Sequence, residues 1–194
     1  LENNVSKAIE GFKKYLLAFP EGLHTLQANF YLAQLHVKEG SNIEAIPNYE
    51  YVIDQPQSEF SEQALNKLSE TLLEKEEWAT AIPLLERLEE EANLPLNILY
   101  AQSNLMKGHY ELEHYEDAVI YAEKVLQRSK LENRVKSDAK VIIARSAFKT
   151  GDEFKAEEAY KDVEKIASGE LKAEAIYFDA YFKNKEGNYK VSNA

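Results

Sequence analysis

The fold is decided by one stretch of the chain, Leu32-Ala-Gln-Leu-His-Val-Lys-Glu-Gly40-Ser-Asn-Ile-Glu-Ala45-Ile-Pro-Asn-Tyr49. In it, a leucine beside a small residue is followed by a glycine, by polar residues and by the small-plus-branched pair Ala45-Ile46. A glycine at the end of one helix, followed by Ser or Asn, is typical of a helix end and a new helix start. The stretch therefore predicts two helices joined by a short turn.

The same arrangement recurs along the chain. Its anchors are Ala8-Ile9, Ala45-Ile46, Ala81-Ile82, Ala118-Val119 and the single residue Ala156, at spacings of 37, 36, 37 and 38. A self-similar period in the thirties is typical of a repeat fold, in which each unit stacks on the next one.

Apolar residues follow each anchor at offsets of three and four, which places them on one face of a helix. The anchor Ala45, for example, is followed by Tyr49, Val52 and Ile53. We expect Pro47 and Pro83 in or near a first helical turn, where proline is tolerated. The pattern predicts no strand and predicts helices at 4–19, 26–39, 42–54, 60–75, 78–92, 96–112, 115–129, 133–150, 153–168 and 171–186.

This pattern resembles the tetratricopeptide repeat (TPR) family, which has a Leu-small pair in the first helix of each unit and an anchor alanine in the second. One repeat matches at Leu32-Ala33, Gly40, Ala45, Tyr49 and Val52. Another matches at Leu105, Tyr115, Ala118 and Val125, although bulky Met106 stands where the family has a small residue. The resemblance implies an all-α fold, a right-handed α-solenoid of antiparallel helix pairs with about five repeats.

We expect a single array over residues 1–194 that is part of a longer bacterial protein. Residues 1–19 match a second helix with no first, and residues 188–194 match the start of another second helix. The repeats fall at about 1–22 (a half repeat), 23–59, 60–95, 96–132, 133–170 and 171–194 (truncated).

The stretch Tyr15–Pro20, followed by Ala28–Ala33, resembles the bacterial envelope branch of the family, which includes Tol–Pal-associated and barrel-assembly lipoprotein-like members. This resemblance implies a periplasmic or outer-membrane-associated protein. A cytoplasmic location is the alternative.

Composition excludes several classes of function. A net charge of −11 and a pI near 5.0 argue against nucleic acid and anionic membrane surfaces, both of which require clustered Lys and Arg. The absence of cysteine excludes thiol catalysis, disulfides and Cys-based zinc sites. No apolar run approaches the roughly 20 residues of a membrane span, so we expect no direct membrane insertion.

No sequence motif points to an enzyme, a metal or a cofactor. The chain has no Gly-rich phosphate loop, no HExxH and no GxSxG. His109 and His114 lie close in sequence, but they are five residues apart and are expected to straddle a turn, which argues against zinc ligation.

The TPR resemblance assigns groove-facing places to the second, fifth, ninth and twelfth residues of each first helix. Tyr and Arg at such places are enriched at interface hot spots, and Lys107 and Arg145 would favour a partner segment that carries carboxylates. For Phe148 and Tyr177 the alternative role is packing between helices. The same places include Glu174, and the candidate partner-binding residues are Phe30, Gln34, Asn66, Tyr100, Ser103, Lys107, Tyr110, Arg145, Phe148, Tyr177 and Tyr181.

We therefore expect a non-catalytic scaffold for protein–protein interaction, which holds an extended or helical partner segment in the concave groove of a TPR superhelix. Two alternatives stay open: a structural spacer in a cell-envelope assembly, and a regulatory repeat region of a larger enzyme. The oligomeric state is left open.

Overall fold

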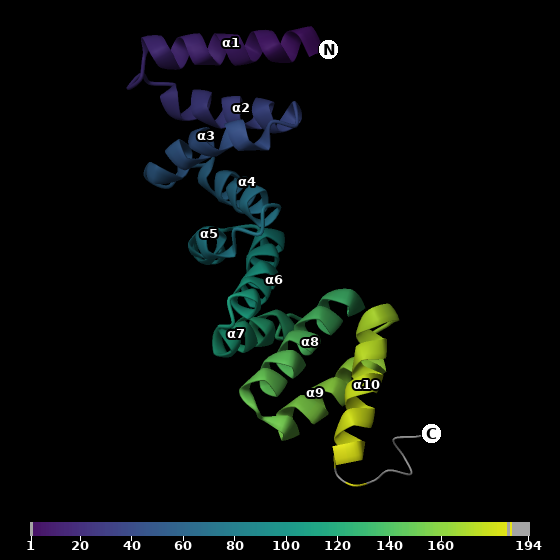
Figure 1. The fold of residues 1–194 in the computed structure, drawn as a ribbon. Helices are drawn as coiled ribbons and strands as arrows, with labels where there is room; N and C mark the ends of the chain where they lie inside the picture. The colour runs from purple at the N-terminus through teal and green to yellow at the C-terminus, as the bar shows by residue number, and fades with distance from the viewer. Residues whose placement is uncertain (1, 186, 188–194) are drawn as a thin grey trace. The chain divides into compact units, whose positions relative to one another are not determined.

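The computed structural model describes residues 2–185 and residue 187, and it confirms the all-α fold (Figure 1). This described part contains no strand, and its helices begin and end close to the predicted positions. They are α1 (Glu2–Ala18), α2 (Thr25–Lys38), α3 (Asn42–Asp54), α4 (Ser61–Leu73), α5 (Trp78–Glu91), α6 (Pro95–Glu111), α7 (Tyr115–Leu126), α8 (Asn133–Thr150), α9 (Glu153–Ile166) and α10 (Gly169–Lys185).

The chain forms two compact units, Leu1–Ile98 and Leu99–Ala194. In the first unit, α1 packs on α2, α2 on α3, α3 on α4, and α4 on α5. In the second unit, α7 packs on α8, α8 on α9, and α9 on α10. Each unit is therefore a stack of consecutive helices joined by short turns.

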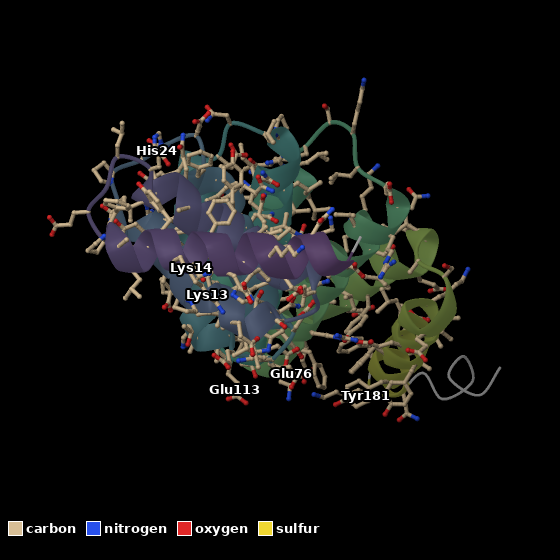
Figure 2. The ribbon with its side chains drawn as sticks, turned by 90° about the horizontal axis from the view of Figure 1, so that it is seen from above. Lys13, Lys14, His24, Glu76, Glu113 and Tyr181 are labelled. Carbon is tan, nitrogen blue, oxygen red and sulfur yellow. The ribbon has the colours of Figure 1, made fainter. Side chains whose placement is uncertain are left out.

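The turns that follow α2, α4, α6, α8 and α10 each have a residue with positive φ at the same repeat position. Three of these residues are the glycines Gly40, Gly151 and Gly187, with φ of 77°, 83° and 78°. The other two are Glu76 (φ 58°) and Glu113 (φ 62°), labelled in Figure 2. Only glycine adopts this left-handed conformation without steric cost, so the two glutamates are strained.

The anchor alanines lie where helices meet, as predicted. Ala45, Ala81, Ala118 and Ala156 are all fully buried, whereas Ala8 on α1 is only half-buried. A large residue one turn after the anchor fills the space beside it, as Tyr49 does after Ala45. The repeat pattern therefore marks the packing positions of the helix pairs.

The two prolines lie just past the first turn of their helices, near the predicted place. Pro47 is the sixth residue of α3 and Pro83 the sixth residue of α5, because both helices begin directly after the turn. Both prolines are exposed, so the carbonyl that loses its helical N–H partner lies on the solvent side, where water can bind it.

Candidate protein-interaction surfaces

The second unit brings several predicted groove residues together. The Arg145 guanidinium on α8 donates from Nε and Nη2 to the Glu174 carboxylate on α10, at 2.8 and 2.5 Å. The Tyr160 hydroxyl on α9 donates to the same carboxylate at 2.9 Å. We call Arg145, Tyr160 and Glu174 the polar network. It ties three successive helices together through one carboxylate.

The pKa values in the polar network reflect its partial burial. Burial alone would raise the pKa of Glu174, but the hydrogen bond and charge of Arg145, with the hydrogen bond from Tyr160, hold that pKa below its usual range. Burial, followed by the charge of Glu174 and the hydrogen bond to it, raises the pKa of Tyr160. Burial also raises the pKa of Tyr110 on α6, which lies close enough to feel the charges of Arg145 and Glu174.

The structure corrects the expected role of Arg145. Its charge was expected to be available for a partner's carboxylate, but the guanidinium is already paired with the Glu174 carboxylate at 2.5 Å. The side chains of Arg145 and Glu174 are 35% and 20% exposed, so a partner would meet a neutral pair. Lys107, which is exposed on α6, is the cation of the predicted set that faces solvent.

Aromatic rings lie beside the polar network on α8 and α10. Phe148 packs against Phe178, Tyr181 and Phe182, with ring centroids 4.9, 5.8 and 6.2 Å apart. Phe148 is half-buried, and Tyr181, labelled in Figure 2, keeps 37% of its surface exposed. The two groove candidates Phe148 and Tyr181 are thus in contact across two helices.

The remaining candidates have different environments. Tyr100 and Ser103 are half-buried on α6, and Tyr177 on α10 is 65% exposed. In the first unit, Gln34 is half-buried and Asn66 donates to Asn97 Oδ1 at 3.3 Å.

Phe30 is only 4% exposed, so it is a packing residue and not open surface. Its ring lies 6.4 Å from that of Tyr49 and 4.7 Å from that of Phe60. A single groove formed by all the candidates stays a prediction.

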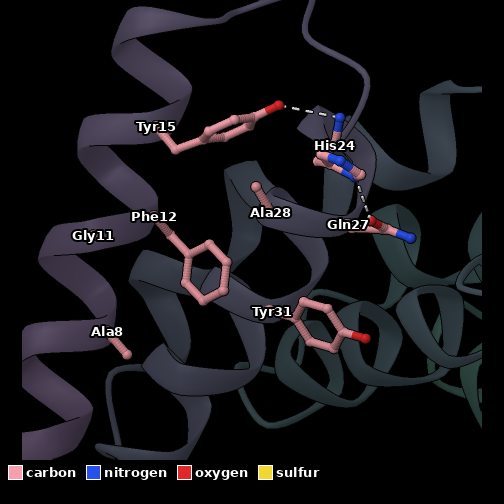
Figure 3. A pocket seen from close by; sticks show the side chains of 8 residues that line it. All are labelled: Ala8, Gly11, Phe12, Tyr15, His24, Gln27, Ala28 and Tyr31. Carbon is pink, nitrogen blue, oxygen red and sulfur yellow. Dashed lines mark hydrogen bonds between the residues drawn. The ribbon is translucent and has the colours of Figure 1, made fainter.

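The first unit has a second surface, which was not predicted from the sequence. An open hollow of about 550 Å³ lies between α1 and α2 (Figure 3). We call it the α1–α2 groove. Its lining consists of one stripe on each helix, Ala8, Gly11, Phe12 and Tyr15 on α1, and His24, Gln27, Ala28 and Tyr31 at the start of and along α2.

The α1–α2 groove has small residues beside aromatic walls. The rings of Phe12 and Tyr31 lie 6.1 Å apart and project into the space between the helices. At one end, the backbone N–H of His24 donates to the Tyr15 hydroxyl at 3.1 Å, and His24 Nδ1 lies 3.0 Å from Gln27 Oε1. The helical spacing of the α1 stripe was the signal in the sequence that could have revealed this groove.

The turn between α6 and α7 brings together residues that sequence spacing kept apart. His109 and His114 do straddle this turn, but with Asp117 they form a group whose ligand atoms all lie within 4.8 Å of one another. Two imidazoles and one carboxylate at this spacing could hold a divalent cation. The geometry equally suits packing, because the buried His109 ring stacks on Tyr121 at 5.3 Å and 7°.

Comparisons with known proteins identify the fold. No family model matches the sequence, and no curated protein matches it. Among solved structures, the chain is similar to a MamA RS-1 ArsTM double mutant, with a TM-score of 0.64 and 14% identity over 87% of this chain and 88% of that chain.

The chain is also similar to the nearly identical TPR-like repeats of a putative kinesin light chain from Podosopora anserina. The TM-score is 0.56, with 17% identity over 89% of this chain and 92% of that one. A crystal structure of a variant of the same protein gives 0.53 and 18% identity, over 85% and 87% of the two chains. These similarities show a TPR-like helical repeat fold.

In the described part of the chain, none of the helices is both long enough and apolar enough to cross a membrane.

Proposed function

We propose that this protein is a non-catalytic scaffold that binds a segment of a partner protein along the first-helix surface of its second unit. The observation that carries the proposal is the Arg145–Glu174 pair, which joins α8 to α10 beside the Phe148–Tyr181 contact. Successive first helices in a stack of helical repeats can form a continuous surface that suits an extended or helical segment.

The chemistry of this surface defines the partner segment. The half-buried Phe148 and exposed Tyr181 offer apolar area at low entropic cost, because aromatic side chains have few rotamers. The Arg145–Glu174 pair is neutral overall, so it contributes directed hydrogen bonds and little net attraction. Exposed Lys107 supplies the attraction for a carboxylate. The best partner segment therefore combines an apolar or aromatic anchor with an acidic residue.

The proposal is tested with peptides selected from a random library for binding to the protein. Tyr181→Ala and Lys107→Ala should each weaken the selected peptides by about tenfold, as expected for loss of an anchor of about 1–2 kcal/mol. Phe154→Ala and Lys149→Ala are matched controls, since both side chains are exposed and lie outside the candidate set. Peptides that bind all four variants alike would refute the assignment of this surface.

A periplasmic or outer-membrane-associated location is part of the same proposal, supported by the resemblance at Tyr15–Pro20, with the cytoplasm as the alternative. Fractionation of cells that produce the protein would decide between them. A spacer without a used groove is the competing function, and it predicts that no selected peptide depends on Tyr181.

A further inference from the structure

The α1–α2 groove has a counterpart one repeat later, and that counterpart is filled. The stripe on α1 recurs 37 residues later as Ala45, Asn48, Tyr49 and Val52 on α3, and the α2 stripe recurs 36 residues later as Phe60, Gln63, Ala64 and Lys67. The helix that occupies this second groove is α2. Its Phe30 ring lies 4.7 Å from Phe60, and Asn48 donates to Asn29 Oδ1 at 2.9 Å. The fold thus shows which kind of element such a groove takes.

The face of α2 that fills the groove consists of Leu26, Asn29, Phe30 and Ala33, spaced three and four residues apart. Its two central side chains, Asn29 and Phe30, are only 7% and 4% exposed, because α3 and the start of α4 cover them. An occupant of the α1–α2 groove should carry the same face on a helix.

Helix α10 carries this face, and in the described part of the chain its central residues are open. At the same repeat position, 147 residues after the face of α2, it has Ala173, Ile176, Tyr177 and Ala180. Ile176 is 49% exposed and Tyr177 is 65% exposed. The chain therefore has an open groove between α1 and α2 and, on α10, the type of helix face that fills such a groove.

We propose that α10 of one copy docks into the α1–α2 groove of a second copy. Tyr177 then takes the place that Phe30 has in the filled groove, beside Phe12 and His24, which correspond to Tyr49 and Phe60. The interface continues the packing between helix pairs from one molecule to the next.

The proposed interface differs from its internal counterpart at one pair of positions, where a large residue faces a small one. The internal groove has a polar pair, Asn29 and Asn48, hydrogen-bonded at 2.9 Å. The proposed interface has Ile176 against Gly11 at these positions. Apart from the backbone of its own helix, a Cβ added at Gly11 would meet nothing within 4 Å, which leaves space for a larger side chain such as isoleucine. An apolar large-to-small contact replaces the polar pair without leaving an unpaired amide.

This interface is heterologous, because the groove and the helix are different surfaces. Each added copy leaves one groove and one α10 free, so association proceeds head to tail and grows with concentration. Continued growth with concentration distinguishes this head-to-tail association from a closed symmetric dimer, in which the same patch pairs with itself.

The test uses two variants of the full chain that each remove one side of the interface. Gly11→Trp fills the groove from an exposed position with open space around it, and Tyr177→Asp places a charge in the α10 face. Each variant alone should be monomeric, with association at least about 30-fold weaker than that of the unmodified chain, as for loss of a hot spot. Glu10→Trp and Phe154→Asp are matched controls on exposed positions outside both surfaces, and should associate as the unmodified chain does.

Mixing the two variants gives the decisive result. The Gly11→Trp copy keeps a working α10 and the Tyr177→Asp copy keeps a working groove, so a mixture should form a dimer with one copy of each, which cannot extend. Sedimentation velocity measures this, and circular dichroism checks that both variants are folded. An unmodified chain that stays monomeric as its concentration rises, or folded variants whose mixture stays monomeric, would overturn the proposal.

The experiment is independent of the proposed partner surface. Lys107→Ala should leave self-association unchanged, and Gly11→Trp should leave peptide binding to the second unit unchanged.

Discussion

Replacing Glu174 with Gln tests whether the polar network stabilises the second unit. The substitution keeps the shape and one hydrogen-bond acceptor for Tyr160, but removes the charge that faces Arg145 at 2.5 Å. The side chains of Arg145 and Glu174 are only 35% and 20% exposed. Their interaction is therefore stronger than that of a surface ion pair and weaker than that of a fully buried one. A hydrogen bond to a charged group contributes about 1.5–3 kcal/mol, and partial exposure to solvent reduces this. We expect a loss of about 1–2 kcal/mol in the free energy of unfolding at pH 7.

The pH dependence gives this prediction a second, independent readout. The pKa of Glu174 is lowered in the folded state from a usual value of 4.5, so its carboxylate stabilises the fold above that value. The stabilisation is lost as the pH falls through the lowered pKa, because the folded protein must then take up a proton. The difference in stability between the unmodified chain and Glu174→Gln should therefore shrink as the solution is acidified from pH 7 to below the usual carboxyl pKa.

The assay is urea unfolding followed by circular dichroism at a series of pH values, with Glu10→Gln as the control because Glu10 is an exposed carboxylate. The control should change the unfolding free energy at pH 7 by no more than about 0.5 kcal/mol. If Glu174→Gln behaves like the control at pH 7, or if its deficit is the same at every pH, the reasoning about the network is wrong.

Three further predictions concern the repeat architecture. Ala81→Phe should destabilise the chain by about 1–3 kcal/mol, because Ala81 is fully buried and a larger side chain overpacks the helix contact; urea unfolding that matches the unmodified chain would contradict the packing described here. Glu113→Gly should instead stabilise the chain by about 0.5–1 kcal/mol, because glycine relieves the strain at φ 62° at some cost in chain entropy; thermal unfolding measures the gain, and the same change at exposed Glu111, the last residue of α6, relieves no strain and should give no gain. Asp152→Ala should cost about 1 kcal/mol, because the Asp152 carboxylate accepts a hydrogen bond from the Lys155 backbone N–H at the start of α9; hydrogen exchange should then rise first at the start of α9, and unchanged exchange there would show that the cap contributes nothing.

The repeat architecture was determined by the sequence alone. Helix positions follow from apolar spacing within a dozen residues, and the turns follow from local features such as Gly40 and Gly151. The anchor alanines were predictable because a small residue at a fixed period has one physical use in this fold, the close approach of neighbouring helices. The strained turn at Glu113 could have been inferred too, since it occupies the same repeat position as Gly40.

The availability of charges and surfaces was decided only by the tertiary structure. Arg145 and Glu174 are 29 residues apart in the chain, and nothing in either local sequence says that the two side chains meet. His109 and His114 converge because the turn between α6 and α7 folds the second residue back over the first. Phe30 was predicted to face a partner but is covered by Tyr49 and Phe60.

The reason for this division is physical. Helix formation and turn geometry depend on neighbours along the chain, so one sequence determines them. Exposure, charge pairing and groove shape depend on side chains brought together from different helices, where a small rotation of one helix changes which atoms meet. The α1–α2 groove therefore became visible only when Phe12 and Tyr31 were placed 6.1 Å apart.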